Sequence, residues 1–253
     1  MKRLVRHASL ALSLCVLFGA AAQATDAVAS RLMQTLSARF PTIRIDAVEP
    51  SPMPGVYQVI AQNQVVYVDA SGDHMIVGNM MDTRSKQNLT AQALDAHQSI
   101  DFKSLPLDEA IKIVKGKGER RMALFADPDC PYCQRLEQDM NATDNVTIYL
   151  FLFPLEQVHP HALADAKAIW CSPDRASAWT NWMVNHTPIP GGGSCADDPI
   201  GKIAVLARSL QIQATPTMFL ENGRRIGGLI PQSQLQQMLA QASAAAGSKS
   251  VPN

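Results

Sequence analysis

Residues 122–133 read MALFADPDCPYC, an apolar run that passes within a few positions into two cysteines. Cys130 and Cys133 lie three residues apart, and the segment that follows, residues 134–140, contains neither Gly nor Pro and repeats apolar side chains at helical spacing. The pattern predicts a strand, a short turn and a helix that begins at a C-x-x-C motif. Such an arrangement is suited to disulfide exchange.

The positions of the two thiols predict different roles for them. Free backbone N–H groups at the start of a helix favour a thiolate on Cys130, which makes it the expected nucleophile. Cys133, one turn further along, can attack the mixed disulfide that Cys130 forms with a substrate. Asp129 could either raise the pKa of Cys130 through its negative charge or cap the helix by accepting backbone N–H groups.

A metal site is the alternative interpretation of a C-x-x-C motif. Zinc needs two further ligands close by, but Cys171 and Cys195 are separated by 23 residues and form no second C-x-x-C. His159 and His161 have no cluster of carboxylates and cysteines around them in the sequence. We therefore expect exposed loop histidines, redox chemistry, no metal and no cofactor.

The first 24 residues have the pattern of a cleavable signal peptide. A basic start (residues 2–6) precedes an apolar stretch (residues 10–22), and small residues at −3 and −1 predict cleavage after Ala24. The apolar stretch is too short for a comfortable membrane span, and no later segment approaches 18 apolar residues. The sequence therefore predicts an exported protein.

Export changes the balance of cysteines and charges. Cys15 leaves with the signal peptide, and the four remaining cysteines can form two pairs in an oxidising compartment. Loss of three basic residues leaves 19 against 22 acidic ones, so the mature chain is mildly acidic and no nucleic acid partner is expected. Its length favours two domains.

Residues 25–84 read as a small α+β unit that serves as a dimerisation domain. A helical pattern at residues 28–40 precedes short strand patterns at 56–61, 65–70 and about 74–78. A unit of this size has little core of its own, so we expect it to pair with a second copy, with the strand at 65–70 offering an edge.

Residues 85–120 predict a helical linker. The helix would start after Ser104 and end at Gly116 and Gly118. Its apolar positions fall at i, i+3, i+4 and i+7: Leu107, Ala110, Ile111 and Val114.

Residues 121–246 show an α/β pattern. The strand and C-x-x-C helix are followed by an apolar strand at 146–153, a helical insertion at about 158–205, a strand at 217–220, a hairpin and a final helix. This is the order of a thioredoxin-like domain that carries an insertion. The fold class is therefore α+β, and we expect a disordered tail at 247–253.

Three segments resemble the periplasmic DsbC/DsbG family of thiol–disulfide isomerases: FADPDCPYC at 125–133, AIWC at 168–171 and ATPT at 214–217. The likeness extends over essentially the whole mature chain. It implies a periplasmic homodimer whose two thioredoxin-like domains face a shared cleft. It also implies misfolded or oxidised exported proteins as substrates and a DsbD-like membrane thiol reductant as electron donor.

The resemblance also implies roles for individual residues. Pro131 and Tyr132 form the dipeptide that tunes redox poise in this superfamily, and Pro131 is tolerated in a first helical turn because it lacks an N–H. The Thr215–Pro216 peptide should be cis and lie against the C-x-x-C motif. The backbone of Thr215 could then pair with a substrate chain.

Cys171 and Cys195 allow two interpretations, a second redox pair or a structural disulfide within the insertion. Their separation, and the Pro/Gly-rich loop before Cys195, favour a structural disulfide.

The expected function is isomerisation or reduction of incorrect disulfides in exported proteins. Two alternatives remain open. The protein could be a net disulfide oxidase that works with Cys130 and Cys133 oxidised, or a dimeric chaperone whose thiols are secondary.

Overall fold

The computed structural model describes residues 27–189, 193 and 195–248, and the chain divides after His97 into two units. The predicted signal peptide and residues 249–253 of the predicted tail lie outside the described residues, whereas residues 247 and 248, which were predicted to be disordered, are helical. Within the described part of the chain, no helix has the length and apolar character needed to cross a membrane.

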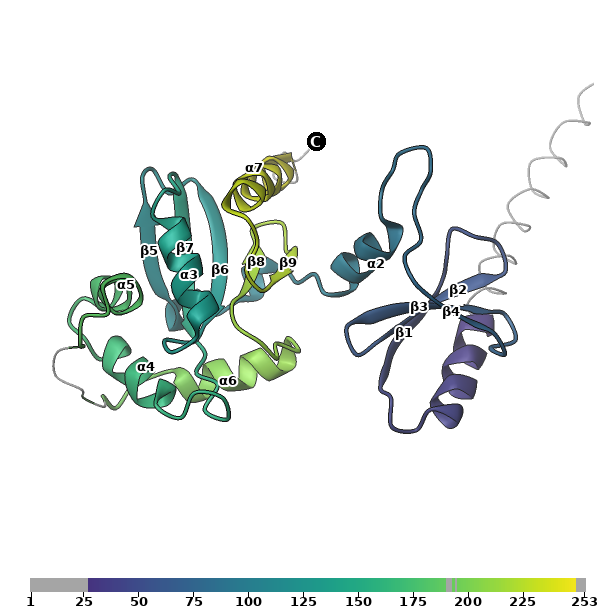
Figure 1. Cartoon of the computed structure of the whole chain (residues 1–253), viewed down its shortest axis with the longest axis horizontal. Coiled ribbons are helices and arrows are strands. Elements are labelled where there is room, and N and C mark those ends of the chain that lie inside the picture. The colour runs from purple at the N-terminus through teal and green to yellow at the C-terminus, as the bar shows by residue number, and fades with distance from the viewer. Residues whose placement is uncertain (1–26, 190–192, 194, 249–253) are drawn as a thin grey trace, which may run out of the picture. The chain divides into compact units, whose positions relative to one another are not determined.

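The N-terminal unit combines a helix at residues 27–39 with an antiparallel sheet whose strands follow one another in sequence order (Figure 1). The strands are β1 (Ile45–Pro50), β2 (Val56–Ala61), β3 (Gln64–Asp69) and β4 (Met75–Val77). The helix and β2 to β4 match the predicted elements, whereas β1 was not predicted because its sequence IDAVEP mixes charges and Pro with a few apolar residues.

The edge of this sheet differs from the prediction. β3 pairs with β2 on one side and with β4 on the other, so the predicted free edge at 65–70 is wrong and β4 is an edge instead. The turn between β2 and β3 consists of Gln62 and Asn63, both with positive φ (50° and 63°), which is the two-residue turn that matches the twist of a hairpin.

Two helices packed against the sheet hold the N-terminal unit together. Leu32 and Leu36 of the first helix pack on one face of the sheet against Tyr57, Val59 and Val68. The segment before the second unit forms α2 (Leu89–His97), which packs against β3. The first part of the predicted linker therefore belongs to this unit.

The C-terminal unit contains a five-stranded sheet in the order β5-β7-β6-β8-β9. Its strands are β5 (Ile111–Lys115), β6 (Arg120–Ala126), β7 (Val146–Leu152), β8 (Thr217–Leu220) and β9 (Arg225–Gly227). β6 and β7 are parallel, and the other neighbours are antiparallel. A parallel central pair explains why β6 and β7 read as continuous apolar runs, since both faces of such strands are buried.

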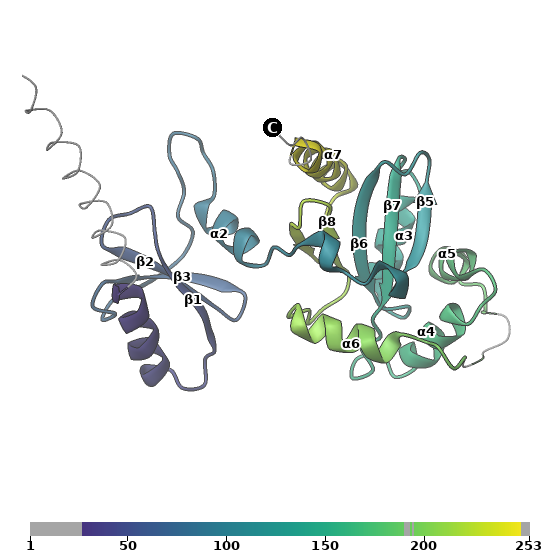
Figure 2. The same ribbon diagram turned by 180° about the vertical axis from the view of Figure 1, so that it is seen from behind.

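Helices cover both faces of this sheet. On one face, α3 (Pro131–Met140) lies in front of the strands in Figure 1 and behind them in Figure 2, next to α5 (Arg175–Asn185) and α7 (Gln232–Ser248). α6 (Ile200–Ser209) packs on the opposite face, and α4 (Ala162–Trp170) lies next to α5. α5 was missed because its segment looked polar and broken by Pro and Gly at its end.

The predicted helical linker is wrong over its second half. Residues 107–109 form a short 3-10 turn, and β5 follows and pairs antiparallel with β7. The apolar residues there fit a helical spacing by coincidence: Ile111 and Ile113 are buried, whereas Val114 is 53% exposed. Burial thus alternates with period two, as in a strand with one solvated face.

Candidate active site

The C-x-x-C motif lies at the junction between β6 and α3, where the sequence predicted it. Cys130 occupies the N-cap of α3 with extended backbone angles (φ −77°, ψ 119°), and Pro131 follows at the first helical position. The backbone N–H of Cys130 donates to the carbonyl of Asp127 at 3.2 Å, and the N–H groups of Cys133 and Gln134 donate to the carbonyl of Cys130 at 3.0 Å. The turn thus fixes Cys130 at the positive end of the helix.

Both thiols are reduced and largely covered. Cys130 is 4% and Cys133 2% exposed, whereas Tyr132 between them is 65% exposed. The Cys130 sulfur lies 3.5 Å from the backbone carbonyl oxygen of Thr215, to which the thiol donates when it is protonated, and the Thr215–Pro216 peptide is cis. The structure therefore brings the two segments around residues 130 and 215 together, although they are 85 residues apart in the chain.

The surroundings shift the two thiols in opposite directions. A hydrogen bond from the Cys133 thiol is the main cause that lowers the pKa of Cys130 to about 5, with smaller contributions from Thr215 and from backbone N–H groups, while burial opposes the shift. Burial raises the pKa of Cys133 far above its usual range. The shifts make Cys130 the more readily ionised of the two thiols, an arrangement that suits a nucleophile beside a resolving thiol.

Thr215 contributes more than its carbonyl. Its hydroxyl oxygen is buried and, across the described residues, has no hydrogen-bond partner. It can therefore turn its proton toward the Cys130 sulfur when that sulfur carries a charge.

Of the two roles predicted for Asp129, the structure contradicts the helix cap. Cys130, not Asp129, is the N-cap of α3, so the helix-capping interpretation is wrong. The net shift of the Cys130 pKa is downward, so any repulsion from Asp129 is outweighed. Burial is the main cause that raises the pKa of Asp129 itself, followed by the nearby charges of Asp165 and Asp127.

Asp127 and His159 belong to the site and were not predicted as such. The Asp127 carboxylate is fully buried, and Nδ1 of His159 lies 2.9 Å from its Oδ2. His159 is therefore not the exposed loop histidine that the sequence suggested, whereas His161 is exposed. The signal that could have found Asp127 is a carboxylate placed between a buried strand and a reactive cysteine. The described residues contain no group of three or more His, Cys, Asp or Glu that could hold a metal.

Two tryptophans of α5 brace the motif from the insertion. The indole N–H of Trp182 donates to the carbonyl of Pro128, in the turn before Cys130, at 2.9 Å. The indole N–H of Trp179 donates at 3.0 Å to Glu137, a buried carboxylate of α3. The insertion thus supports both the turn and the helix that carry the thiols.

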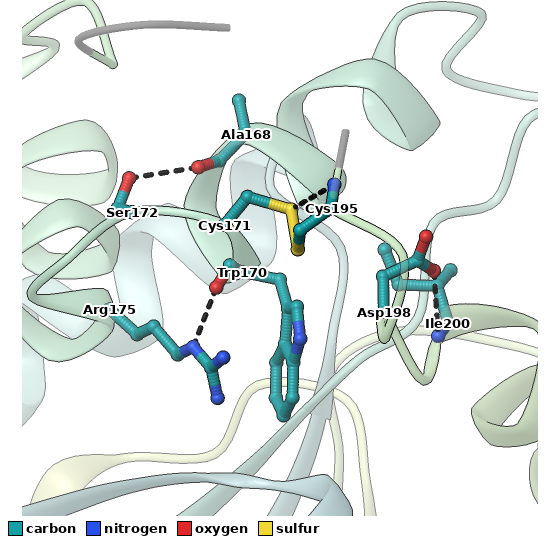
Figure 3. The surroundings of a disulfide bond; sticks show 8 residues. All are labelled: Ala168, Trp170, Cys171, Ser172, Arg175, Cys195, Asp198 and Ile200. Carbon is teal, nitrogen blue, oxygen red and sulfur yellow. Dashed lines mark hydrogen bonds between the residues drawn. A yellow bond between two sulfur atoms is a disulfide. The ribbon is translucent and has the colours of Figure 1, made fainter. Parts of the chain in front are cut away.

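Cys171 and Cys195 form a disulfide within the insertion, one on each side of α5 in the sequence, with 5.6 Å between their Cα atoms (Figure 3). Cys171 is the C-cap of α4, and its sulfur accepts the backbone N–H of Cys195 at 2.9 Å. Next to it, the guanidinium of Arg175 lies 3.8 Å from the ring centre of Trp170 and donates to its carbonyl. The bond joins the end of α4 to the segment before α6.

Comparison with known proteins gives matches to both units. A family model described as a thioredoxin-like domain matches residues 107–243, and one described as the N-terminal domain of disulfide bond isomerase proteins matches residues 19–91. A probable thiol:disulfide interchange protein DsbC of Bordetella pertussis is 33% identical over 218 residues, which cover 86% of this chain and 76% of that protein. DsbC of Escherichia coli K12 is 28% identical, covering 90% of this chain and 92% of its own length.

Among solved structures, a disulfide interchange protein from Neisseria gonorrhoeae is 40% identical, with a TM-score of 0.53, and covers 55% of this chain and 99% of its own. The thioredoxin-like match begins at residue 107, immediately before β5, in agreement with β5 as a strand of the catalytic sheet. The chain therefore belongs to the DsbC family of thiol:disulfide interchange proteins.

Proposed function

We propose that the protein is a periplasmic isomerase and reductase that rearranges or reduces incorrect disulfides in exported proteins. The observation that carries this proposal is the opposite shift of two adjacent thiols, with the pKa of Cys130 lowered to about 5 and that of Cys133 raised. A thiolate ready to attack is thus placed beside a thiol that stays protonated until it is needed.

The chemistry proceeds by thiolate exchange. The Cys130 thiolate attacks one sulfur of a substrate disulfide: a bond from Cys130 to the substrate forms, the substrate S–S bond breaks, and its electron pair leaves on the other substrate sulfur. In isomerisation, a different substrate thiolate then attacks the bonded substrate sulfur and releases Cys130 as a thiolate. In reduction, Cys133 loses its proton and attacks the Cys130 sulfur: the Cys130–Cys133 bond forms, the bond to the substrate breaks, and the substrate sulfur leaves with the electron pair and takes up a proton.

Thr215 supports the proposed substrate complex. Its carbonyl lies beside the Cys130 sulfur, and a substrate strand bonded to Cys130 would run close to this backbone. Its hydroxyl can stabilise the thiolate that is regenerated after each exchange. Tyr132, which is exposed next to Cys130, would contact the substrate chain.

We infer that the N-terminal unit makes the protein a homodimer. β4 is an edge strand whose side chains are apolar and exposed: Met75 by 46%, Ile76 by 62% and Val77 by 75%. A free apolar edge of this kind favours pairing with another chain. A dimer would hold a partly unfolded substrate near two Cys130 thiols, which isomerisation needs more than simple oxidation does.

The proposed compartment and reductant follow from the predicted signal peptide and from membership of the DsbC family. The signal peptide supports export to the periplasm, where a DsbD-like membrane reductant would return Cys130 and Cys133 to the dithiol after each reduction.

A Cys133→Ala protein tests the proposal directly. Without the resolving thiol, mixed disulfides through Cys130 should accumulate with misbridged exported proteins and identify them by mass spectrometry. The matched control is Cys130→Ala, which should capture none of them. Capture through Cys133 in the control protein would reverse the assigned roles and contradict the mechanism.

Net oxidation is a second candidate, favoured by the strongly lowered pKa of Cys130, because a stabilised thiolate makes the disulfide form a better oxidant. Rapid acid quenching of cells followed by alkylation would measure the redox state of the pair in the periplasm. A mostly reduced pair supports isomerase and reductase function, and a mostly oxidised pair supports the oxidase.

The dimer has its own test. A truncated protein that begins at Gln98 keeps β5 and the whole C-terminal unit. It should be monomeric, keep the thiol reactivity of Cys130 and lose most refolding activity on a scrambled multi-disulfide substrate. Equal refolding by the truncated and the full mature protein would contradict a role for the dimer.

A further inference from the structure

A buried ion pair beside the dithiol takes no part in the exchange chemistry described above. Asp127 follows the last residue of β6, and its carboxylate is fully buried. One carboxylate oxygen accepts the backbone N–H of Asp129 at 2.8 Å. The other accepts the backbone N–H of Leu155 at 2.7 Å and faces Nδ1 of His159 at 2.9 Å.

These contacts tie two loops together. Asp127 and Asp129 belong to the turn between β6 and α3, whereas Leu155 and His159 belong to the segment between β7 and α4. A buried carboxylate is costly unless it is paired and hydrogen-bonded. Within the described residues, the side chain of His159, which is 19% exposed, is the only side chain that pairs with the Asp127 carboxylate.

Asp127 in turn contacts both cysteines of the motif through its backbone. Its carbonyl accepts the backbone N–H of Cys130 at 3.2 Å, and its own backbone N–H faces the sulfur of Cys133. The charge of Cys130 also acts on His159. The position and the charge of the pair can therefore affect the dithiol.

We propose that His159 is a positioning residue of the dithiol: its imidazolium holds the Asp127 carboxylate, and through it the turn that carries Cys130, and compensates the negative charge of the reacting sulfurs. His159 acts through Asp127 and through its charge, without contact with the substrate. The inference rests on Cys130 as the attacking thiol but does not require isomerase function.

The charge matters because every exchange step is anionic. When the Cys133 thiolate attacks the Cys130 sulfur of a mixed disulfide, the Cys130–Cys133 bond forms, the bond to the substrate breaks, and the electron pair leaves on the substrate sulfur. One negative charge is present throughout. With a neutral His159, the Asp127 carboxylate would oppose this charge, whereas an imidazolium offsets the carboxylate.

The direction of the pH effect follows from the groups around His159. The hydrogen bond with Asp127 is the main cause that raises the pKa of His159, and the charges of Asp127, Cys130 and Asp129 raise it further, against burial. Asp165 of α4 faces the same group of charges through Asp129. The imidazolium therefore persists above the usual histidine range near pH 6.5, and its contribution is lost as the pH rises through the raised pKa.

The test compares His159→Asn with the matched control His161→Asn, in the full mature protein. An Asn side chain can still donate a hydrogen bond to Asp127 but carries no charge, and His161 is an exposed histidine two residues away. The thiolate absorbance of Cys130 and its rate of exchange with a small aromatic disulfide are measured against pH.

We expect His159→Asn to raise the pKa of Cys130 by roughly half a unit to one unit, as expected for loss of a nearby opposite charge. It should also remove the decline in the exchange rate of the thiolate that the wild-type protein shows as His159 loses its proton. His161→Asn should match the wild type in both. A His159→Asn protein with wild-type values in both measurements would overturn the proposal.

A second measurement needs no variant. The His159 imidazole is titrated by NMR in the wild-type protein, once with Cys130 and Cys133 reduced and once with the pair oxidised to a disulfide. Because oxidation removes the thiolate charge, and coupling between two sites is reciprocal, the pKa of His159 should fall on oxidation. The same pKa in both states would refute the coupling.

Discussion

The two cysteine pairs of the C-terminal unit have the same atoms and different surroundings. Cys130 and Cys133 are free thiols at the N-terminal end of α3, where the pKa of Cys130 is lowered to about 5. Cys171 and Cys195 are bonded, and Cys171 lies at the C-terminal end of α4. The opposite helix ends matter, because a helix start favours a thiolate and the carbonyls of a helix end disfavour it.

The pairs also differ in what a bond between them would constrain. Cys130 and Cys133 are neighbours within one helical turn, so a disulfide between them closes a very short loop and orders little of the chain. The Cys171–Cys195 bond closes a loop of more than 20 residues that contains the whole of α5. One pair is therefore suited to electron exchange and the other to holding the insertion.

The largest expected difference concerns activity. Cys130→Ser should reduce isomerisation and reduction of a scrambled substrate to the uncatalysed rate, because a serine hydroxyl is not ionised near neutral pH and forms no mixed disulfide. Cys171→Ser should keep most of the activity at a temperature where the protein is folded. Refolding of a scrambled multi-disulfide protein measures both. Comparable losses in the two variants would mean that the second pair also takes part in the chemistry.

The next effect concerns stability. Opening the Cys171–Cys195 bond should destabilise the unit by roughly 3 kcal/mol, the value expected from loop closure at this length. Denaturant unfolding of a Cys171→Ser, Cys195→Ser double variant measures it, with Ser209→Ala, which removes an exposed hydroxyl of α6, as the control. Differential alkylation adds a second check, because a mild reductant that opens an oxidised Cys130–Cys133 pair should leave Cys171 and Cys195 protected. Equal labelling of all four cysteines would contradict a structural role.

A smaller effect is the pH dependence of Cys130. With its pKa lowered to about 5, its alkylation rate should be nearly constant from pH 8 to about 6 and fall to half near pH 5. The stabilisation of the folded, reduced protein by this thiolate is fully present above the pKa of an unfolded cysteine, about 8.5, and is lost as the pH falls through about 5. Iodoacetamide kinetics on the reduced wild-type protein give the profile of Cys130, because Cys133 is buried and its pKa is raised, so it does not compete for the reagent. A midpoint near 8.5 would show that the surroundings do not activate the thiol.

The sequence predicted the motif well because its signals are local. A strand, a turn and a helix around Cys130 and Cys133 follow from apolar periodicity and from the position of two cysteines, and residues 146–152 read as a buried strand for the same reason. The segment at 111–115 was misassigned because Ile111 and Val114 continue a helical spacing that starts at Leu107 and Ala110, and only pairing with β7 selects the strand.

Other parts of the site depend on contacts across the chain. Asp127 and His159 are 32 residues apart and meet only because the loops after β6 and β7 leave the same end of two parallel neighbours. Trp182 reaches the turn before Cys130 from α5, 54 residues later. Periodicity within one segment carries no information on such contacts, so His159 looked like an exposed loop residue.

The smallest expected effect tests whether the Cys171–Cys195 disulfide and the turn before Cys130 are coupled. Trp182→Phe removes the hydrogen bond to the carbonyl of Pro128 and keeps most of the aromatic packing, so a loss of about 1 kcal/mol in stability and a change of a few-fold in Cys130 alkylation are expected. α5, which carries Trp182, lies inside the loop closed by Cys171 and Cys195, so opening the disulfide should loosen the same brace.

A double-mutant cycle of Trp182→Phe with the Cys171→Ser, Cys195→Ser double variant therefore measures the connection. If the disulfide supports the active-site turn through Trp182, the substitution should cost less in stability and alter alkylation less once the disulfide is gone, giving a coupling of at least about 0.5 kcal/mol. Ser209→Ala, which removes an exposed hydroxyl on α6, serves as an uncoupled control. Strict additivity for Trp182→Phe would mean that the disulfide stabilises the insertion without acting on the turn that holds Cys130.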